Sequence, residues 1–302
     1  MGWGKVDDKD SQRAIEVALE HGINFFDTAD LYGCGHSEEV LGKALTGKRP
    51  DVVIASKFGY KFNEQTKIVT GRLNIPDEIE DALHASLKRL RTDYLDLYQL
   101  HISDFPETAA EAVQDRLEKL IVAGKIRSYG WSTDDASRVS AFAPSKFCVA
   151  VQQALNVLQG DLATLAATER RGMASLCRSP LAMGILTGKW SARKALPGND
   201  LRSRWNHSVG PVPTMVKVVE SIRHILSQDG RSLTQGALAW LWAKSDTTVP
   251  IPGFRNATQV LENVGAVKKG PLTEKQMLAI DKIVSRDFPN NPWDLRRTQH
   301  PA

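Results

Sequence analysis

The stretch Gly22–Gly33, GINFFDTADLYG, contains a short apolar run that closes on an aspartate and is followed by a polar turn. We interpret Ile23–Thr28 as a β-strand. Six further runs of this kind follow along the chain: Val52–Lys57, Tyr94–His101, Arg127–Ser132, Cys148–Gln152, Met173–Cys177 and Thr247–Pro250. Most of them lack two-residue alternation, which is typical of strands buried on both faces of a parallel sheet.

Segments with helical periodicity separate these runs. The predicted helices are Asp10–His21, Pro76–Arg91, Val113–Ala123, Asp134–Phe142, Asp161–Arg171, Val216–Ser227, Thr234–Lys244, Ala257–Ala266 and Glu274–Ser285. The longest stretches predicted to be irregular, Gly59–Ile75 and Trp190–Pro213, both follow predicted strands. In a parallel barrel, loops after strands line the active site.

The alternation of strands and helices, with no long linker, predicts one α/β domain over residues 1–302. No GxGxxG turn follows the first strand, which argues against an open dinucleotide-binding sheet and favours a (β/α)8 TIM barrel. Because only seven strands are predicted, we expect the first strand of this barrel to be missing. The sheet should then have unpaired edges at Ile23–Thr28 and at Thr247–Pro250.

Composition narrows the functional class. Of 302 residues, 42% are hydrophobic and 25% are charged, as in ordinary soluble domains. The formal charge of +4 comes without a basic run, so we expect a small phosphorylated ligand rather than a nucleic acid. Three widely spaced cysteines argue against a disulfide scaffold or a structural zinc site. Without an apolar run of roughly 20 residues or a signal-peptide pattern, we expect a cytoplasmic protein with no membrane partner.

Polar residues stand at or just beyond the ends of the first three predicted strands. Asp27, Lys57 and His101 close apolar runs, and Tyr32 follows Asp27 by five positions. Taken singly, each is commonly structural, as a cap, a packed ring, an extended lysine or a hydrogen-bonded histidine. Because the ends of parallel strands meet at one mouth of a barrel, we expect the four side chains to converge there.

Such a group has coherent chemistry. Tyrosine, with an ordinary pKa of about 10, is a poor acid at neutral pH. A lysine cation beside it favours the phenolate, and an aspartate keeps that lysine charged and oriented. A histidine can position a carbonyl oxygen. The four residue types therefore predict a tyrosine that acts as general acid on a carbonyl receiving hydride.

Gly22–Gly33, continued by HSEEVLG at His36–Gly42, resembles the aldo-keto reductases, in particular the branch that includes bacterial enzymes and the potassium-channel β subunits. Further matching blocks are DYLDLYQLH at Asp93–His101, GKIRSYGWS at Gly124–Ser132, SPLAMGILTGK at Ser179–Lys189 and IPGFR at Ile251–Arg255. The resemblance extends over about residues 10–285. It implies a TIM barrel that uses NADPH to reduce a small aldehyde or ketone.

The family's catalytic tetrad falls on Asp27, Tyr32, Lys57 and His101 of this chain. The resemblance also implies the cofactor site. The residues expected along the nicotinamide and pyrophosphate are Ser132, Gln152, Arg178, Ser179, Leu181, Gly184 and Lys189. No metal ligand is implied.

The adenosine end of the cofactor is expected at the start of the helix Ala257–Ala266. Asn256 can cap this helix, and free amides at a helix N-terminus beside Arg255 make an anion site. By resemblance, Arg255 holds the 2′-phosphate, which favours NADP(H) over NAD(H). The residues expected around it are Gly253, Gln259, Glu262 and Asn263.

The chain departs from the family in three places. Arg178 stands where most relatives stack an aromatic ring on the nicotinamide, and its cation should repel the oxidised cofactor. Thr133 stands where asparagine is usual. Relatives also carry an N-terminal hairpin and a first strand, which we expect to be missing from this chain.

Two other functions stay open on the sequence alone. One is a non-catalytic regulatory module that binds NADP(H). The other is a lyase or isomerase that forms a Schiff base at Lys57. Neither the particular carbonyl substrate nor the oligomeric state is indicated.

Overall fold

Seven parallel strands form the centre of the computed structural model, which describes residues 6–142, 145–189, 200–205 and 211–287. In sheet order they are β1 (Phe25–Asp27), β2 (Val53–Phe58), β5 (Leu95–Leu100), β6 (Ile126–Ser132), β7 (Cys148–Asn156), β9 (Ala174–Arg178) and β10 (Thr248–Pro250). The short β8 (Gln159–Gly160) pairs with β7 in the antiparallel direction. All seven predicted strands are therefore confirmed, with shifted ends.

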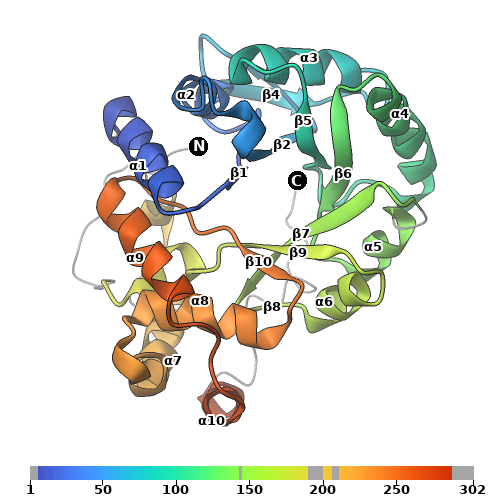
Figure 1. Cartoon of the computed structure of the whole chain (residues 1–302). Helices are drawn as coiled ribbons and strands as arrows, with labels where there is room; N and C mark the ends of the chain where they lie inside the picture. Colours follow the sequence, from blue (N-terminus) through green and yellow to red (C-terminus); the bar gives the residue numbers. More distant parts are fainter. Residues whose placement is uncertain (1–5, 143–144, 190–199, 206–210, 288–302) are drawn as a thin grey trace.

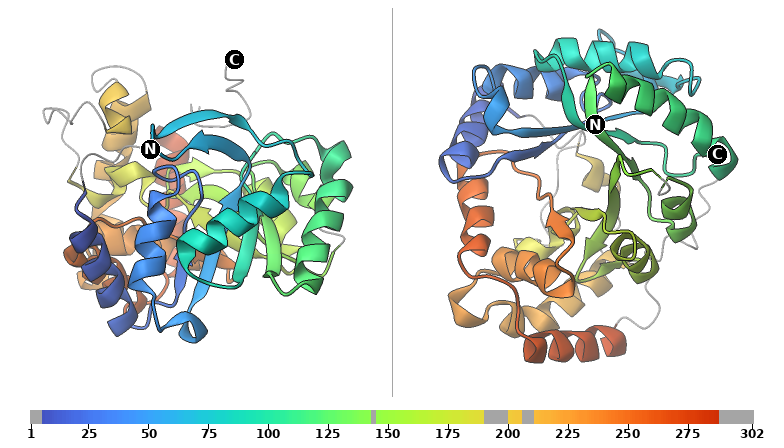
Figure 2. Two further views of the ribbon diagram at one scale, coloured as in Figure 1. Left: turned by 90° about the horizontal axis from the view of Figure 1, so that it is seen from above. Right: turned by 45° about the vertical axis from the view of Figure 1, so that its right-hand side comes forward.

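Helices surround the curved sheet on its outer side (Figure 1). They are α1 (Asp8–Glu20), α2 (His36–Ala44), α3 (Ile79–Leu90), α4 (Ala110–Val122), α5 (Ala136–Phe142), α6 (Leu162–Glu169), α7 (Pro211–Leu226), α8 (Leu233–Lys244), α9 (Ala257–Val267) and α10 (Glu274–Asp287). Short 3₁₀ helices are η1 (Arg49–Asp51), η2 (Glu107–Ala109), η3 (Ala182–Thr187), η4 (Leu201–Arg204) and η5 (Gln228–Gly230). Two further directions of view show α10 at the periphery, where it packs against α7 and α8 (Figure 2). The order of strands and helices is that of an α/β barrel.

The hydrogen-bonded path around the sheet is open in the described ranges. There, β1 pairs only with β2, and β10 pairs only with β9. These are the two edges that the sequence analysis expected to be unpaired. On the outer side, α1 packs against α9, so the helical layer continues past the opening (Figure 1).

The sequence analysis missed a helix and a hairpin, as well as the short β8 and the 3₁₀ helices. The helix α2 is short, and the residue before it, Gly35, has a φ of 89° and offers no capping side chain. The usual sequence signals for the start of a helix are therefore absent. The predicted irregular stretch Gly59–Ile75 contains an antiparallel hairpin of β3 (Tyr60–Asn63) and β4 (Ile68–Arg72). Every residue of β4 is exposed, so the hairpin has no buried apolar stripe to reveal it. Within the other predicted irregular stretch, residues 190–199 and 206–210 lie outside the described residues, and η4 lies between them.

Alternate residues of the strands face two different interiors. Towards the helices, Ile54 and Phe58 join the large core that α1 to α5 cover. Towards the barrel axis, Ala55 belongs to a small apolar layer whose other buried members are Leu97, Ala150 and Leu176. Lys57, two residues after Ala55, therefore points to the axis above this layer. The strand pleat thus places the lysine in the barrel.

The contact between α7 and α8 leaves no room at Gly236. A β-carbon there would lie 2.0 Å from the carbonyl oxygen of Leu226. Because backbone must move to relieve this clash, we expect Gly236→Ala to lower the free energy of unfolding by about 1–3 kcal/mol or more. Urea unfolding followed by circular dichroism would measure the loss.

The matched control is Gly265→Ala in α9. A β-carbon there would lie 2.4 Å from the side-chain nitrogen of Gln235, which is the end of a flexible side chain. We expect a clearly smaller loss, since the helix propensity of alanine offsets the adjustment. Equal losses at the two positions would contradict the steric explanation.

Candidate active site

Four predicted catalytic side chains meet at one end of the parallel strands. Asp27 ends β1, Lys57 lies one residue before the end of β2, and His101 follows β5 directly. Tyr32 lies in the loop between β1 and α2. Since all three strands run in the same direction, their carboxyl ends share one mouth. The structure therefore brings the four residues together as expected.

A buried ion pair joins two of them. The Nζ atom of Lys57 donates to Oδ2 of Asp27 at 2.5 Å and to the carbonyl oxygen of Thr28 at 2.7 Å. The other carboxylate oxygen of Asp27, Oδ1, accepts from Nε2 of Gln152 at 2.7 Å and of Gln99 at 3.4 Å. Side chains from three other strands, β2, β5 and β7, thus fix the carboxylate.

The environment keeps Lys57 charged. Burial alone would lower the pKa of Lys57, but the carboxylate of Asp27 and the phenol of Tyr32 raise it above its ordinary value. The Nζ atom lies 5.0 Å from the centroid of the Tyr32 ring. A permanent cation beside a phenol stabilises the phenolate that forms when the phenol gives up its proton.

His101 is held between two tyrosine rings and is neutral. Its ring centroid lies 5.8 Å from that of Tyr32 and 5.7 Å from that of Tyr60, both in edge-on geometry. Burial, together with the cations Lys57 and Arg178, lowers the pKa of His101 to about 3. Its Nδ1 atom is buried without a hydrogen-bond partner among the described residues. A neutral imidazole can hydrogen-bond a carbonyl oxygen without adding charge.

The predicted nicotinamide residues lie around the same mouth. Ser132 ends β6 and is buried, whereas Gln152 in β7 donates its amide to Asp27. Arg178 ends β9 and forms an ion pair with Asp134. The sequence analysis did not predict this ion pair, because it assigned Asp134 to the beginning of a helix. In the structure Asp134 lies two residues beyond the end of β6.

The predicted pyrophosphate loop has an unusual backbone. Ser179, Ala182, Met183 and Gly184 have φ values of 53°, 47°, 52° and 100°. The amide of Gly184 donates to the carbonyl oxygen of Leu181 at 2.9 Å. Ala182, Met183 and Gly184 are three consecutive left-handed residues, and the amide of Ala182 donates to the carbonyl oxygen of Ser179 at 2.9 Å, so the chain turns tightly here. Lys189 is exposed just beyond the loop.

The predicted adenosine site lies at the N-terminus of α9. Asn256 caps this helix by accepting from the amide of Gln259, and Gly253 and Arg255 are exposed beside it. The side-chain oxygen of Gln259 accepts from the amide of Arg255 at 2.7 Å.

Two other features near α9 were not predicted. Glu262, one turn into the helix, accepts from Ser232 and so connects α9 to α8, while Asn263 follows it on the same helix. Arg202, and more weakly Arg255, lower the pKa of Asp200. No sequence motif joins Arg202 to Arg255, so the sequence did not indicate that both act on Asp200.

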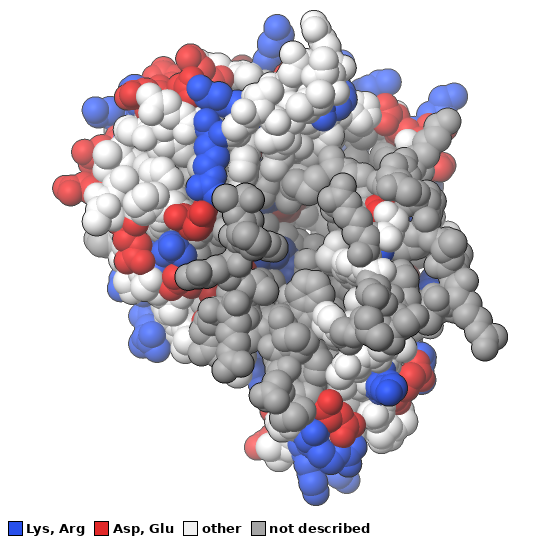
Figure 3. Space-filling view, turned by 180° about the vertical axis from the view of Figure 1, so that it is seen from behind, with Lys and Arg blue, Asp and Glu red and all other residues white. Residues whose placement is uncertain are grey.

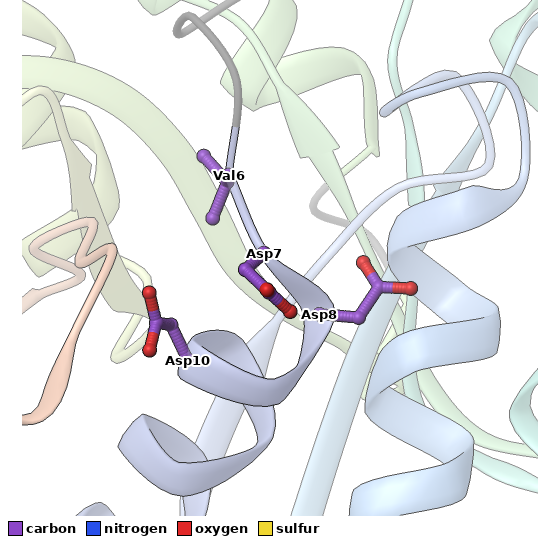
Figure 4. A pocket seen from close by; sticks show the side chains of 4 residues that line it. All are labelled: Val6, Asp7, Asp8 and Asp10. Carbon is purple, nitrogen blue, oxygen red and sulfur yellow. The ribbon is translucent and has the colours of Figure 1, made fainter.

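Away from this mouth, the described surface carries mixed charge (Figure 3) and a shallow hollow. On the side seen in Figure 3, basic and acidic side chains are interspersed. A hollow of about 590 Å³ at the start of α1 is lined by Val6, Asp7, Asp8 and Asp10 (Figure 4). Asp7 caps α1, and Asp8 pairs with His36 of α2 at 2.9 Å, so these carboxylates are explained by structure.

The described residues also bear on metals and membranes. They contain no group of three or more histidine, cysteine, aspartate or glutamate side chains that could hold a metal ion. Their helices include none that is both long and apolar enough to cross a membrane.

Known proteins with similar sequences include two reductases. An aldo-keto reductase of Schizosaccharomyces pombe, named with NADP(+), is 32% identical over 277 residues, which cover 88% of this chain and 80% of that protein. The chloroplastic pyridoxal reductase of Arabidopsis thaliana is 31% identical, with 88% and 74% covered.

Solved structures agree with this. A glycerol dehydrogenase of Gluconobacter oxydans superposes with a TM-score of 0.84 at 31% identity, covering 95% of this chain and 89% of that one. An aldo-keto reductase of Klebsiella pneumoniae in complex with NADPH has a TM-score of 0.69 at 24% identity, covers 94% and 88%, and supports the fold. The Aldo/keto reductase family matches residues 1–285. On this match, the relatives and the barrel, the chain belongs to the aldo/keto reductase family.

Proposed function

We propose that this protein reduces an aldehyde or ketone to an alcohol, with NADPH as hydride donor and Tyr32 as general acid. One observation carries the proposal. The buried ammonium of Lys57 is paired with Asp27 at 2.5 Å and lies 5.0 Å from the Tyr32 ring. A phenol beside a permanent buried cation is prepared to release its proton, which is what the developing alkoxide of a reduced carbonyl requires.

Each residue of the tetrad has a defined part. Tyr32 gives its proton to the carbonyl oxygen, and Lys57 stabilises the phenolate that remains. Asp27 holds Lys57 in place, and Gln152 in turn holds Asp27. His101, neutral because of its lowered pKa, hydrogen-bonds the carbonyl oxygen and orients it towards Tyr32.

The described residues fit the proposed NADP(H) cofactor, which supplies the hydride when bound. We place the pyrophosphate at the tight turn from Ser179 to Gly184, which follows the end of β9, and the capped N-terminus of α9 with Arg255 suits a further phosphate. Ser132, at the end of β6, would offer its hydroxyl to the nicotinamide amide, and Gln152, whose amide nitrogen holds Asp27, would offer its side-chain oxygen. We therefore assign the cofactor to the residues that the sequence analysis named.

Arg178 takes a different part from the one its sequence position suggested. Its guanidinium pairs with the carboxylate of Asp134, whose other oxygen accepts from the amide of Ala154 at 2.6 Å. This carboxylate compensates much of the positive charge. We therefore propose that Arg178 disfavours the oxidised cofactor less than an unpaired arginine would.

A Schiff-base reaction at Lys57 is the poorer alternative. Such chemistry needs a neutral amine, whereas Asp27 and Tyr32 raise the pKa of this buried lysine. The ion pair therefore favours a role for Lys57 as a fixed charge.

Tyr32→Phe tests the proposed general acid. The phenylalanine ring retains the shape but has no proton to give, so we expect kcat for 4-nitrobenzaldehyde to fall by about 10²–10⁴-fold. The affinity for NADPH should stay within a few-fold, because the phenol acts on the carbonyl. NADPH oxidation followed by absorbance, and NADPH titration by fluorescence, measure the two quantities.

Tyr60→Phe is the matched control for this experiment. Its ring lies at a similar distance from His101, 5.7 Å, but Lys57 contacts Tyr32 instead. We expect this variant to keep most of the native rate. A Tyr32→Phe protein that also keeps its rate would remove Tyr32 from the mechanism, and a native protein that binds NADPH without turnover would favour the regulatory module.

Arg255→Ala tests the proposed 2′-phosphate contact. Loss of a charge-assisted hydrogen bond costs about 1.5–3 kcal/mol, which corresponds to roughly 10- to 150-fold in affinity. NADH lacks this phosphate, so its affinity should change little. Fluorescence titrations of both cofactors measure the difference.

Lys268→Ala provides the control, since it removes an exposed cation from the opposite end of α9. We expect it to leave the ratio of NADPH to NADH affinity unchanged. Equal losses of both cofactors in Arg255→Ala would show that Arg255 does not read the 2′-phosphate.

A further inference from the structure

A second buried carboxyl lies behind the tetrad. Asp30 follows Asp27 by three residues and is 2% exposed. Its Oδ1 atom is buried and has no hydrogen-bond partner among the described residues. Its backbone amide donates to the carbonyl oxygen of Lys57 at 3.5 Å. Asp30 is therefore linked to the strand that carries the catalytic lysine, but the proposed mechanism does not use it.

The surroundings of Asp30 lie on the helix side of β2. Ser56, the residue before Lys57, donates to Oε1 of Glu38 at 2.5 Å. Oε2 of Glu38 accepts from Nε of Arg89 at 2.7 Å. Tyr98 is the register partner of Ser56 on β5, and its hydroxyl is likewise buried without a partner. The strand β2 thus separates this cluster from the tetrad.

The charges of the two groups are already balanced without Asp30. Lys57 is paired with Asp27, and Arg89 is paired with Glu38. Among the residues that the structure describes, no lysine or arginine nitrogen lies within ion-pair distance of Asp30. An unpaired buried carboxylate is very costly, whereas its protonated form is neutral.

Ionisable groups on the surrounding elements interact electrostatically with Asp30. They are Glu38 of α2, Arg89 of α3, Lys57 of β2, Tyr98 of β5 and Tyr60 of β3. Burial and the Glu38 carboxylate raise the pKa of Asp30 to about 8, and this exceeds the opposing effects of the Leu31 amide, Arg89 and Lys57. The buried position without an ion-pair partner and the raised pKa therefore both favour the protonated carboxyl of Asp30.

We propose that Asp30 is a positioning residue whose carboxyl carries a proton in the working protein. Asp27 is then the one ionised carboxylate of the two that acts on the ammonium of Lys57. The role in catalysis rests on the proposed function. When this proton leaves to solvent, a second carboxylate acts on Lys57 and reduces the stabilisation that the lysine gives to the Tyr32 phenolate. Carbonyl reduction then slows. Asp30 itself passes no proton to the substrate.

Stability against pH tests the proton on Asp30 without any activity. Asp30→Asn mimics the protonated carboxyl and cannot ionise. The folded protein holds a proton up to a pKa of about 8, while an unfolded aspartate releases it at about 3.9. Between these values the Asp30 carboxyl makes the native protein lose stability as the pH rises, and the variant lacks this contribution. The ratio of their unfolding constants should change by about tenfold per pH unit.

Urea unfolding at pH 5, 6, 7 and 8 would measure this ratio. The control is Asp115→Asn on the exposed face of α4, for which we expect no pH-dependent difference from the native protein. A ratio for Asp30→Asn that stays constant with pH would overturn the proposal. If this variant fails to fold, carboxyl ¹³C NMR of the native protein decides, since one aspartate should titrate near pH 8.

The pH profile of NADPH-dependent aldehyde reduction tests the positioning role. We expect kcat of the native protein to decline at lower pH on the alkaline side than kcat of Asp30→Asn. An unmoved alkaline limb together with the stability difference would show a protonated Asp30 with no catalytic role, which overturns the proposal. A native protein with no reductase activity would refute the proposed function and the positioning role together, while the stability ratio would still report the proton.

Discussion

The buried contact between Lys57 and Asp27 constrains the rest of this barrel. Two charges taken out of water must be held in good geometry and with their remaining hydrogen bonds satisfied. The protein achieves this with side chains of β1, β2, β5 and β7, together with the carbonyl oxygen of Thr28. The pair is stable only while these strands keep their relative register, so the sheet and the site depend on each other.

Much of the fold and part of the site could be predicted from sequence. Strands were found because apolar runs are local, and Asp27, Lys57 and His101 stood out because charged or polar residues closed those runs. Contacts made over long distances could not be found in this way. The bond from Gln152 to Asp27 spans 125 residues, and nothing near Gln152 signals its partner. The ion pair of Arg178 with Asp134 spans 44 residues and was hidden similarly.

The elements that were missed share a physical cause. The helix α2 and the hairpin β3–β4 bury little apolar surface in a regular pattern, so periodicity does not reveal them. They are fixed instead by polar contacts with other elements, such as the bond of Ser56 to Glu38 in α2. Hydrophobic periodicity in the sequence indicates which residues are buried. It does not reveal the parts of a fold that are held by polar pairs.

The strand β2 carries a different polar system on each of its two faces. Lys57 points towards the barrel axis, where it pairs with Asp27. Its neighbour Ser56 points towards the helices, where it donates to Glu38. A shift of one residue would send the ammonium towards Arg89 and the serine towards Asp27. Insertions or deletions within Val53–Phe58 should therefore be excluded during divergence of the family, whereas the exposed hairpin that follows is free to vary in length. The loops at the mouth can then change in length and sequence above a strand whose register must stay fixed.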